Sequence, residues 1–527
     1  MHQDAQGGSR DKLSGPVVET AIGKIRGLVS NGLCLFRGIP YAATAVGKGR
    51  FKAPGKHPGW RGIRDALNLG PRAPQLRPAT SIPGLASASL PMSEDCLVLN
   101  VLTPGLEGKR PVMVWFHGGG FESGSGSDYT GSGGLPQKED VVLVQVNHRL
   151  NIFGYLYLKD VDPQFPDSGN VGQLDLIAAL QWVRENIEDF GGDPGNVTVF
   201  GASGGGAKVS ALMAMPGAAG LFHRAIAQGG CLVRAIEPDC ATETTLRVLR
   251  ILGLQPSEVE RLCLLPQEIL LDALVVLARE RSPASIMGTF GPVVDGTILP
   301  RHPWSPAAPE VSRDVPLLIG CTKDEATVLL GLLKGAPDRL FNLGVSDLVP
   351  ALQDSLAIDE RQAGGLIDAY RRYRPSDLAS QIFFAIGTDY LMRGPASLQA
   401  ERKDAQGAAP AFLYLFDWVP PAVPAALGAY HGLELPFVFD TLEEETGLIG
   451  GKIGSNPDAV CLANQVRGAW AQFARTGDPN HPRLPLWPRY GRHARATMVF
   501  NTPTKVLNDP RGKERATMAE FLVSSHF

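Results

Sequence analysis

Short apolar runs alternate with amphipathic stretches along the middle of this 527-residue chain. The runs at 111–116 (PVMVWF), 141–146 (VVLVQV) and 196–200 (NVTVF) are rich in β-branched residues and predict buried strands. Apolar residues recur at helical spacing over 175–190 and 207–215, which predicts an amphipathic helix in each stretch. Strands that alternate with helices in this way indicate a mostly parallel sheet with helices on both faces.

The same alternation continues toward the C-terminus. Strands are predicted at 315–320 (VPLLIG) and 411–418 (AFLYLFDW), and a closing helix is predicted at 507–522. The regions at about 233–290 and about 324–400 are mostly helical in pattern and predict helical insertions between strands of the sheet.

Near the N-terminus, the stretches 17–27 (VVETAIGKIRG) and 34–42 (CLFRGIPYA) indicate antiparallel strands at an edge of the sheet. The sequence shows no internal repeat. Because a large α/β enzyme can bury its core in one unit, we expect a single domain over 1–527.

The bulk composition argues against two classes of partner. A formal net charge of −3, with 20% charged residues, gives no electrostatic basis for binding nucleic acid or an anionic membrane surface. No apolar run is long enough to span a bilayer. The first fifteen residues are polar and lack the apolar core of a secretory signal, so we expect a cytoplasmic location, with secretion left open if a leader was removed.

The seven cysteines are odd in number, and no pair has C-x-x-C spacing. This pattern favours a reducing compartment and gives little support to a structural zinc site. We expect no metal and no cofactor.

A glycine-rich segment surrounds Ser203. Residues 201–205 (GASGG) fit the pattern G-x-S-x-G and lie between a predicted strand and a predicted helix, as the nucleophile elbow of serine hydrolases requires. Small residues on both sides allow close packing while the serine takes a strained conformation. The alternative is a glycine-rich turn without chemistry.

A second glycine run, HGGGF at 117–121, directly follows the strand at 111–116. Such a run lets backbone N–H groups turn toward a developing oxyanion. Gly119 and Gly120 would supply two donors, and Gly204 a third. The alternative is a flexible turn.

A serine nucleophile needs a general base and an acid, which follow it in the order Ser, acid, His in one class of hydrolase. Among the histidines after Ser203, we favour His431, while His302 remains possible. Asp324 and Glu325 both follow the strand at 315–320 and are candidates for the acid. Both would also suit the N-terminus of a helix without any catalytic role.

Ordered sequence blocks over nearly the whole chain resemble the type-B carboxylesterase family, which includes bacterial para-nitrobenzyl esterases and cholinesterases. The blocks are FRGIPYA (36–42), SEDCLVLNV (93–101), VMVWFHGGGF (112–121), NHRLNIFGYL (147–156), the segment 169–206, DEA (324–326) and HGLELPFVF (431–439). The resemblance implies an α/β-hydrolase fold whose helical insertions form an active-site gorge. It also implies a small-molecule ester substrate and an acyl-enzyme intermediate.

The resemblance further implies a Ser203–His431–Glu325 triad, with Glu325 rather than Asp324 as the acid. It implies oxyanion amides at Gly119, Gly120 and Gly204, and a supporting role for Glu434 near the histidine. We expect Glu94 and Asp95 to be structural members of ion pairs. Beyond these residues, Phe341, Phe383 and Phe384 could line a pocket, although core packing is the better expectation for each.

Three features depart from the family pattern. Ala202 and Gly204 flank the nucleophile where the family usually has Glu and Ala. No cysteine lies between Cys34 and Cys96, so the short-loop disulfide of secreted members is not expected. The stretch 81–92, which we expect at the rim of the gorge, has no aromatic residue, so a cation–π site for choline is not expected.

Two other functions remain open. The chain could be a catalytically impaired, cholinesterase-like binding module, or a hydrolase of amide or carbamate bonds. The natural ester substrate and the oligomeric state are left open by the sequence.

Overall fold

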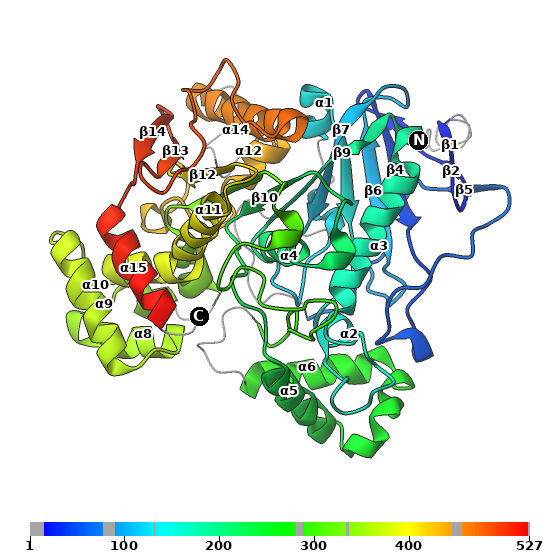
Figure 1. Cartoon of the computed structure of the whole chain (residues 1–527), viewed down its shortest axis with the longest axis horizontal. Helices are drawn as coiled ribbons and strands as arrows, with labels where there is room; N and C mark the ends of the chain where they lie inside the picture. Colours follow the sequence, from blue (N-terminus) through cyan, green and yellow to red (C-terminus); the bar gives the residue numbers. More distant parts are fainter. Residues whose placement is uncertain are drawn as a thin grey trace, which may run out of the picture.

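A large sheet forms the centre of the protein in the computed structural model, which describes residues 15–76, 90–129, 133–280, 288–333, 337–444, 448 and 456–524. Within these residues, eleven strands hydrogen-bond in the order β14-β13-β12-β11-β10-β9-β7-β8-β6-β4-β3 (Figure 1). Strands β1, β2 and β5 form a separate small sheet. The strands are β1 (Val17–Thr20), β2 (Gly23–Arg26), β3 (Leu28–Ser30), β4 (Leu33–Pro40), β5 (Ile63–Asp65), β6 (Val98–Thr103), β7 (Arg110–Phe116), β8 (Val142–Val146), β9 (Gly192–Ala202), β10 (Arg224–Gln228), β11 (Leu317–Thr322), β12 (Ala411–Phe416), β13 (Ala496–Phe500) and β14 (Lys505–Asn508).

The middle of the large sheet is parallel, from β8 through β7, β9, β10, β11 and β12 to β13. Antiparallel pairs stand at its edges, where β6 pairs with β8 and β4 with β6 on one side, and β14 pairs with β13 on the other. The predicted mostly parallel sheet is therefore confirmed, and the stretch 34–42 supplies the antiparallel strand β4 near one edge. The stretch 17–27 was also expected at that edge, which was wrong: it forms β1 and β2 of the separate small sheet, where β1 pairs antiparallel with β2 and β2 pairs parallel with β5.

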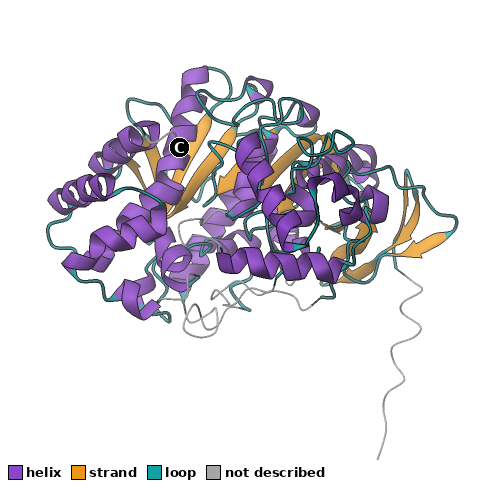
Figure 2. Cartoon of the chain, turned by 90° about the horizontal axis from the view of Figure 1, so that it is seen from below, coloured by secondary structure: helices purple, strands orange, loops and turns teal. Residues whose placement is uncertain are grey.

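Helices cover both faces of the sheet (Figure 2). The helices are α1 (Gly134–Glu139), α2 (Asn151–Tyr155), α3 (Val171–Asn186), α4 (Gly204–Leu212), α5 (Pro238–Ile251), α6 (Gln267–Glu280), α7 (Pro337–Phe341), α8 (Leu348–Leu356), α9 (Glu360–Tyr373), α10 (Ala379–Thr388), α11 (Gly394–Gln406), α12 (Leu435–Phe439), α14 (Pro457–Thr476) and α15 (Gly512–Ser524).

The period of two along a strand divides the core into two layers. In β7, Val112, Val114 and Phe116 join the hydrophobic cluster that contains residues of α3, α4 and α11. The alternate residues Met113 and Trp115 join the cluster on the opposite face, which contains residues of α1, α12 and α14. A strand buried on both faces must be apolar throughout, which is why its sequence shows a continuous run.

Helices α5 and α6 form one group beside the sheet, and α8, α9 and α10 form another (Figure 1). Helices α5 and α6 pack in one hydrophobic cluster, and α8, α9 and α10 pack with α15 in another. That these groups wall a gorge within a single domain over 1–527 stays a prediction.

The expected closing helix at 507–522 was wrong in its first part. Leu507 and Asn508 end the edge strand β14, and α15 begins only at Gly512. The segment between them, DPR, contains Asp509 and Arg511 at positive φ, a turn that the helical pattern does not reveal.

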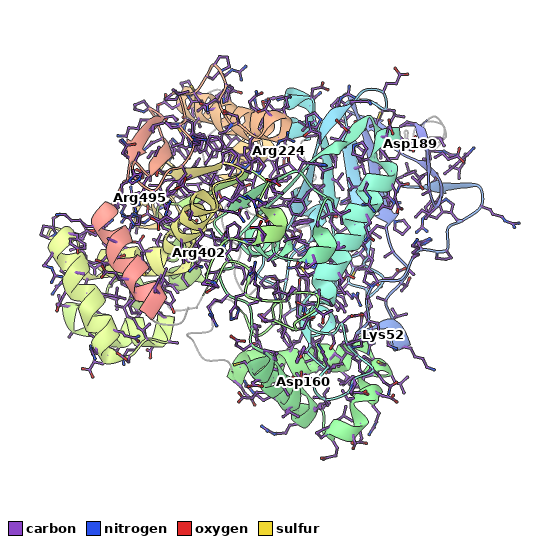
Figure 3. The ribbon with its side chains drawn as sticks, in the orientation of Figure 1. Lys52, Asp160, Asp189, Arg224, Arg402 and Arg495 are labelled. Atoms are coloured by element: carbon purple, nitrogen blue, oxygen red, sulfur yellow. The ribbon has the colours of Figure 1, made fainter. Side chains whose placement is uncertain are left out.

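Acidic and basic side chains are both spread around the molecule (Figure 3). Lys52 and Asp160 lie at the end with α5 and α6, whereas Arg402 and Arg495 lie on the side of α11. No helix in the described part of the chain has both the length and the apolar character needed to cross a membrane.

Candidate active site

Ser203 occupies the sharp turn between β9 and α4. Its backbone has φ 56° and ψ −126°, a conformation that residues with a side chain rarely adopt. The turn is fixed by two hydrogen bonds: the Ser203 N–H donates to the carbonyl of Gln228 at 2.8 Å, and the Ser203 carbonyl accepts from the N–H of Ala207 at 3.1 Å. The strained strand–turn–helix predicted from the glycine pattern is therefore present.

The glycines around the turn are required by close backbone contacts. A Cβ on Gly205 would lie 2.0 Å from the carbonyl oxygen of Phe116, at the end of β7. A Cβ on Gly230, in the loop after β10, would lie 1.7 Å from the carbonyl oxygen of Ser203. Because backbone atoms cannot move aside cheaply, both positions exclude any side chain.

Glu325 and His431 form a buried hydrogen-bonded pair, between Glu325 Oε2 and His431 Nδ1. The second oxygen of Glu325 accepts the N–H of Thr322 at 2.7 Å, so the carboxylate is held at the end of β11. Because a carboxylate only accepts, Nδ1 carries the imidazole proton and Nε2 is left as an acceptor. This is the tautomer that a general base needs.

Asp324 makes a different contact. Its Oδ2 accepts the N–H of Ala429 at 2.9 Å, and its own N–H donates to the Ala429 carbonyl at 2.9 Å. Asp324 thus ties the segment before His431 to the end of β11. Of the two acids left open by the residue pattern, only Glu325 is hydrogen-bonded to His431.

The loop after β10 joins the serine to this pair. Gly230 packs on the Ser203 carbonyl, and the adjacent Gly229, at φ 45°, packs on Glu325, whose Oε1 would lie 2.7 Å from a Cβ there. The carboxyl ends of β9, β10 and β11 therefore bring Ser203, Glu325 and His431 to one edge of the sheet.

Two further acid–base properties follow from burial and charge. Burial disfavours the charged form of His431, but the charge and hydrogen bond of Glu325, aided by Glu434, outweigh it and raise the pKa of His431 above 6.5. Burial, and then the negative charge of Glu325, raises the pKa of Glu434 to about 7. Glu434 Oε1 lies 3.5 Å from Gln228 Nε2 and 3.4 Å from the hydroxyl of Tyr414.

The HGGGF loop lies directly against the elbow. The carbonyl of Gly119 accepts the N–H groups of Glu122 and Ser123 at 3.2 and 3.0 Å, so the trans peptide points the Gly120 N–H the opposite way. The carbonyl of Gly118 accepts from His117 Nδ1 at 2.9 Å, which orients the Gly119 N–H in the same manner. The carbonyls of Gly118 and Gly119 thus hold the loop, and the N–H groups of Gly119 and Gly120 point away from these hydrogen bonds.

The two departures that flank Ser203 have different surroundings. A Cβ on Gly204 would lie 2.1 Å from the carbonyl oxygen of Gly120, so the backbone of the HGGGF loop fills the space of the alanine that the family usually has there. Ala202 is buried and pairs with Gln228 in the sheet, beside the residue that contacts Glu434.

The other predicted residues lie outside this cluster. Glu94 forms a two-point ion pair with Arg50, at 2.6 and 2.7 Å, as expected, whereas Asp95 is exposed and accepts from Thr44 at 2.7 Å.

Phe341, Phe383 and Phe384 pack against one another in the cluster of α8–α10. His302 is hydrogen-bonded to Glu237. Residues 81–89 of the expected rim loop lie outside the described residues.

Two residues that contact the site were missed from the sequence. Gln228 holds Ser203 through its carbonyl, and its amide Nε2 lies 3.5 Å from Glu434. It ends β10, a strand whose short RAIAQ sequence shows no run of β-branched residues. Lys208 on α4 donates to the carbonyl of His117 at 2.9 Å. A lysine inside the apolar stretch AKVSALMAM was the feature that could have pointed to it.

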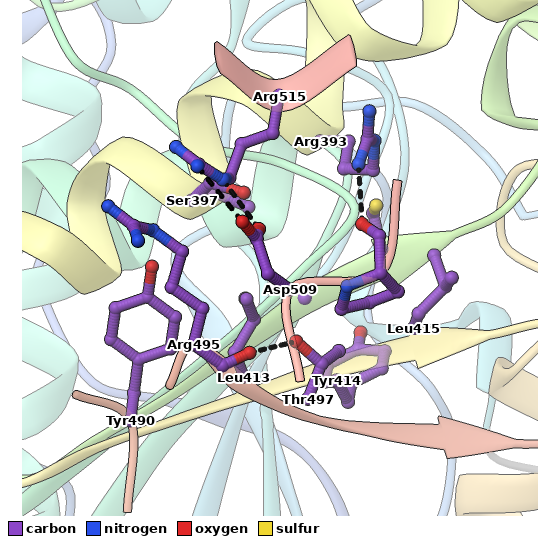
Figure 4. Close-up of a pocket in the computed structure, with 14 residues that line it drawn as sticks. Arg393, Ser397, Leu413, Tyr414, Leu415, Tyr490, Arg495, Thr497, Asp509 and Arg515 are labelled. Carbon is purple, nitrogen blue, oxygen red and sulfur yellow. Dashed lines mark hydrogen bonds and ion pairs between the residues drawn. The ribbon is translucent and has the colours of Figure 1, made fainter. Parts of the chain in front are cut away.

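A separate hollow lies beside α11, β12, β13 and α15 (Figure 4). Its three arginines are each paired with an acid: Arg393 with Asp389, Arg495 with Glu401, and Arg515 with Asp509. It contains none of the predicted catalytic residues and is therefore not the candidate active site. Among the residues that the structure describes, no group of three or more His, Cys, Asp or Glu side chains could hold a metal ion.

Known families and proteins match this chain along almost its whole length. The model of the Carboxylesterase family matches residues 14–518. The para-nitrobenzyl esterase of Bacillus subtilis (strain 168) is 37% identical over 503 residues, which cover 95% of this chain and 97% of that protein. A phenmedipham hydrolase of Pseudarthrobacter oxydans is 33% identical and covers 92% of this chain and 95% of its own.

Solved structures agree with these matches. A thermophilic para-nitrobenzyl esterase superposes with a TM-score of 0.83 at 36% identity, over 96% of this chain and all of that one. The fold is therefore that of the α/β-hydrolases, as the sequence blocks implied.

Proposed function

Because this chain belongs to the carboxylesterase family, and is thus a serine hydrolase of carboxylic esters, we propose that Ser203, His431 and Glu325 are its catalytic triad. The observation that carries the proposal is the buried Glu325–His431 hydrogen bond beside the strained turn at Ser203. We further propose that the amides of Gly119, Gly120 and Gly204 form the oxyanion hole.

The mechanism follows from the tautomer of His431. With its proton on Nδ1 and facing Glu325, His431 accepts the Ser203 hydroxyl proton at Nε2 as the serine oxygen attacks the ester carbonyl. The imidazolium that forms is stabilised by the buried carboxylate of Glu325. Proton return to the leaving alcohol yields the acyl-enzyme, which water cleaves by the same steps in reverse roles.

The backbone amides of the HGGGF loop and of α4 would bind the oxyanion that forms on the ester carbonyl. Gly204 is the first residue of α4, so its N–H belongs to the unsatisfied N-terminal amides of the helix. The packing of Gly120 on Gly204 supports a convergence of the three amides on one place. Preorganised donors of this kind contribute roughly 10²–10³ each in rate.

Ser203→Ala tests the triad. We expect the loss of p-nitrophenyl ester turnover with an unchanged melting temperature, since the substitution removes a single oxygen atom and keeps the turn. Ser210→Ala is a matched control, because Ser210 lies on α4, the helix that directly follows Ser203, is buried, and its hydroxyl donates to Gln399 at 3.3 Å rather than to any residue of the triad. Turnover retained by Ser203→Ala would exclude Ser203 as the nucleophile.

The types of bond that the enzyme cleaves, and the size of the esters that it accepts, can be tested with a panel of substrates. Since relatives are named for para-nitrobenzyl esters and for phenmedipham, both compounds belong in a panel with esters of graded acyl and alcohol size. Cleavage of phenmedipham or an anilide would extend the reaction beyond simple esters. A folded protein that turns over none of them would favour the binding-module alternative.

A cytoplasmic location is the last part of this proposal, and it rests on the unpaired cysteines. Fractionation of the producing cells tests it.

A further inference from the structure

A fully buried lysine lies beneath the HGGGF loop. Lys208 is on α4, in the second turn after Ser203, and its side chain is not exposed at all. Its Nζ donates to the carbonyl of His117 at 2.9 Å and lies 5.9 Å from the centre of the Phe121 ring. His117 and Phe121 are the two ends of the loop, so one amino group is hydrogen-bonded to one end and lies over the aromatic ring of the other.

A lysine in this position is costly. Desolvation disfavours its charged form, and no acid forms an ion pair with it among the described residues. Methionine would occupy a similar volume without that cost. Lys403, a second deeply buried lysine, is different because it donates to the carbonyls of Ser312 and Arg313 and to Gln406, at 2.7–2.9 Å.

Two stacked histidines complete the surroundings of Lys208. The rings of His117 and His148 lie 4.9 Å apart and nearly parallel, and their Nδ1 atoms donate to the carbonyls of Gly118 and Arg149 at 2.9 and 2.8 Å. Burial first, and then the positive charge of Lys208, lowers the pKa of both rings, so both are neutral near pH 7.

The remaining charges next to this cluster are also positive or already paired. Arg72 further lowers the pKa of His117, and Arg149 that of His148. Arg149 itself is neutralised by Asp175, at 2.6 and 2.9 Å. Within the described residues, the cluster therefore offers no negative partner to Lys208, whose amino group donates to the loop instead.

We propose that Lys208 is a positioning residue of the oxyanion hole, which holds the His117 carbonyl and places positive charge beneath the amides of Gly119 and Gly120. This rests on the proposed function, because it takes those amides to be the oxyanion donors. A charge-assisted hydrogen bond is about twice as strong as a neutral one, so the hold on His117 is tightest when Lys208 is protonated.

The charge of Lys208 changes near neutral pH. Burial lowers the pKa of Lys208 to about 7, so its ammonium is present below that pH and is lost as pH rises through it. His431 must be neutral to act as a base, so kcat rises with pH through the pKa of His431. The two ionisations together predict a kcat profile that first rises and then declines on the alkaline side.

Lys208→Met is the test, with Lys403→Met as the matched control. We expect Lys208→Met to lower kcat at pH 7 at least about tenfold with KM within about twofold, because the oxyanion is absent from the bound ester and develops only in the transition state and tetrahedral intermediate. The alkaline decline should disappear. Lys403→Met, which removes a buried lysine whose pKa burial lowers to about 8, should keep the wild-type kcat and profile.

The outcomes separate this proposal from the one on which it rests. If a fluorophosphonate labels Ser203 in the wild-type enzyme while Lys208→Met keeps full kcat or keeps the alkaline decline, the role of Lys208 is overturned and the triad stands. If Ser203 is not labelled, the proposed function itself fails. Should Lys208→Met not fold, the wild-type profile decides, since a flat kcat between pH 7 and 9 overturns the proposal.

Discussion

Replacing Glu325 by glutamine probes the triad through a single buried hydrogen bond. The carboxylate makes two contacts that both need an acceptor, whereas an amide has only one: Oε1 accepts the Thr322 N–H at 2.7 Å, and Oε2 accepts from His431 Nδ1. If the amide oxygen of Gln takes the Thr322 N–H, its NH₂ group must face Nδ1. Nδ1 can then only accept, so the imidazole proton moves to Nε2 and the Ser203 hydroxyl loses its base.

The flipped amide does not rescue the enzyme. It would place the NH₂ group against the Thr322 N–H, leaving two donors in contact at a site with no exposed surface, at a cost of about 1–3 kcal/mol. The orientation that forces the wrong tautomer is therefore favoured. A triad in the wrong tautomer loses roughly 10⁴ in kcat, or about 5.5 kcal/mol of transition-state stabilisation.

The assay is p-nitrophenyl acetate hydrolysis between pH 6 and 9, with the melting temperature measured alongside. Asp324→Asn is the matched control, because the asparagine side-chain oxygen can still accept the Ala429 N–H and the residue does not touch His431. We expect Asp324→Asn to keep kcat within about threefold. A Glu325→Gln enzyme with more than about a tenth of the wild-type kcat would refute the reasoning.

Three other substitutions follow from the surroundings of the site. Glu434→Gln should lower the kinetic pKa of His431, because the negative charge of Glu434 helps to raise it; an unmoved acid limb of kcat/KM would contradict this. Ala202→Glu should raise the same pKa, by up to about one unit, since it adds a buried negative charge beside Gln228 and Glu434; a lowered value counts against it. Gly204→Ala should lower kcat at least about tenfold by displacing the Gly120 carbonyl, whereas Gly365→Ala, with nothing within 4 Å of the added Cβ, should be silent; equal kcat in both variants would show that the loop has room.

Much of this architecture could be predicted because it rests on local patterns. The strands β7 and β8, and the second half of β9 from Val197 to Ala202, are largely buried and therefore have mostly apolar sequences. The glycines at 204–206 and 230 stand where an added Cβ would lie only 1.7–2.4 Å from a backbone oxygen of another segment, so their positions in the sequence already mark the crossing of chain segments.

What could not be predicted depends on contacts between distant segments. Strand β10 has a weak pattern of its own and is a strand because β9 and β11 pair with it on both sides. The residue pattern alone left Asp324 and Glu325 equivalent; the family resemblance favoured Glu325, and the contacts with Ala429 and His431 give the physical difference between them. Lys208 and His117 are 91 residues apart, so their hydrogen bond has no trace in local spacing.

Covalent labelling of the nucleophile tests the central claim most directly. The purified enzyme is treated with a fluorophosphonate until ester hydrolysis stops, and the adduct is then located by peptide mass spectrometry. A serine on a strained turn beside a buried Glu325–His431 pair predicts one adduct per chain, on Ser203, formed in step with the loss of activity. An adduct on another residue, or full inactivation with Ser203 unmodified, would contradict the account.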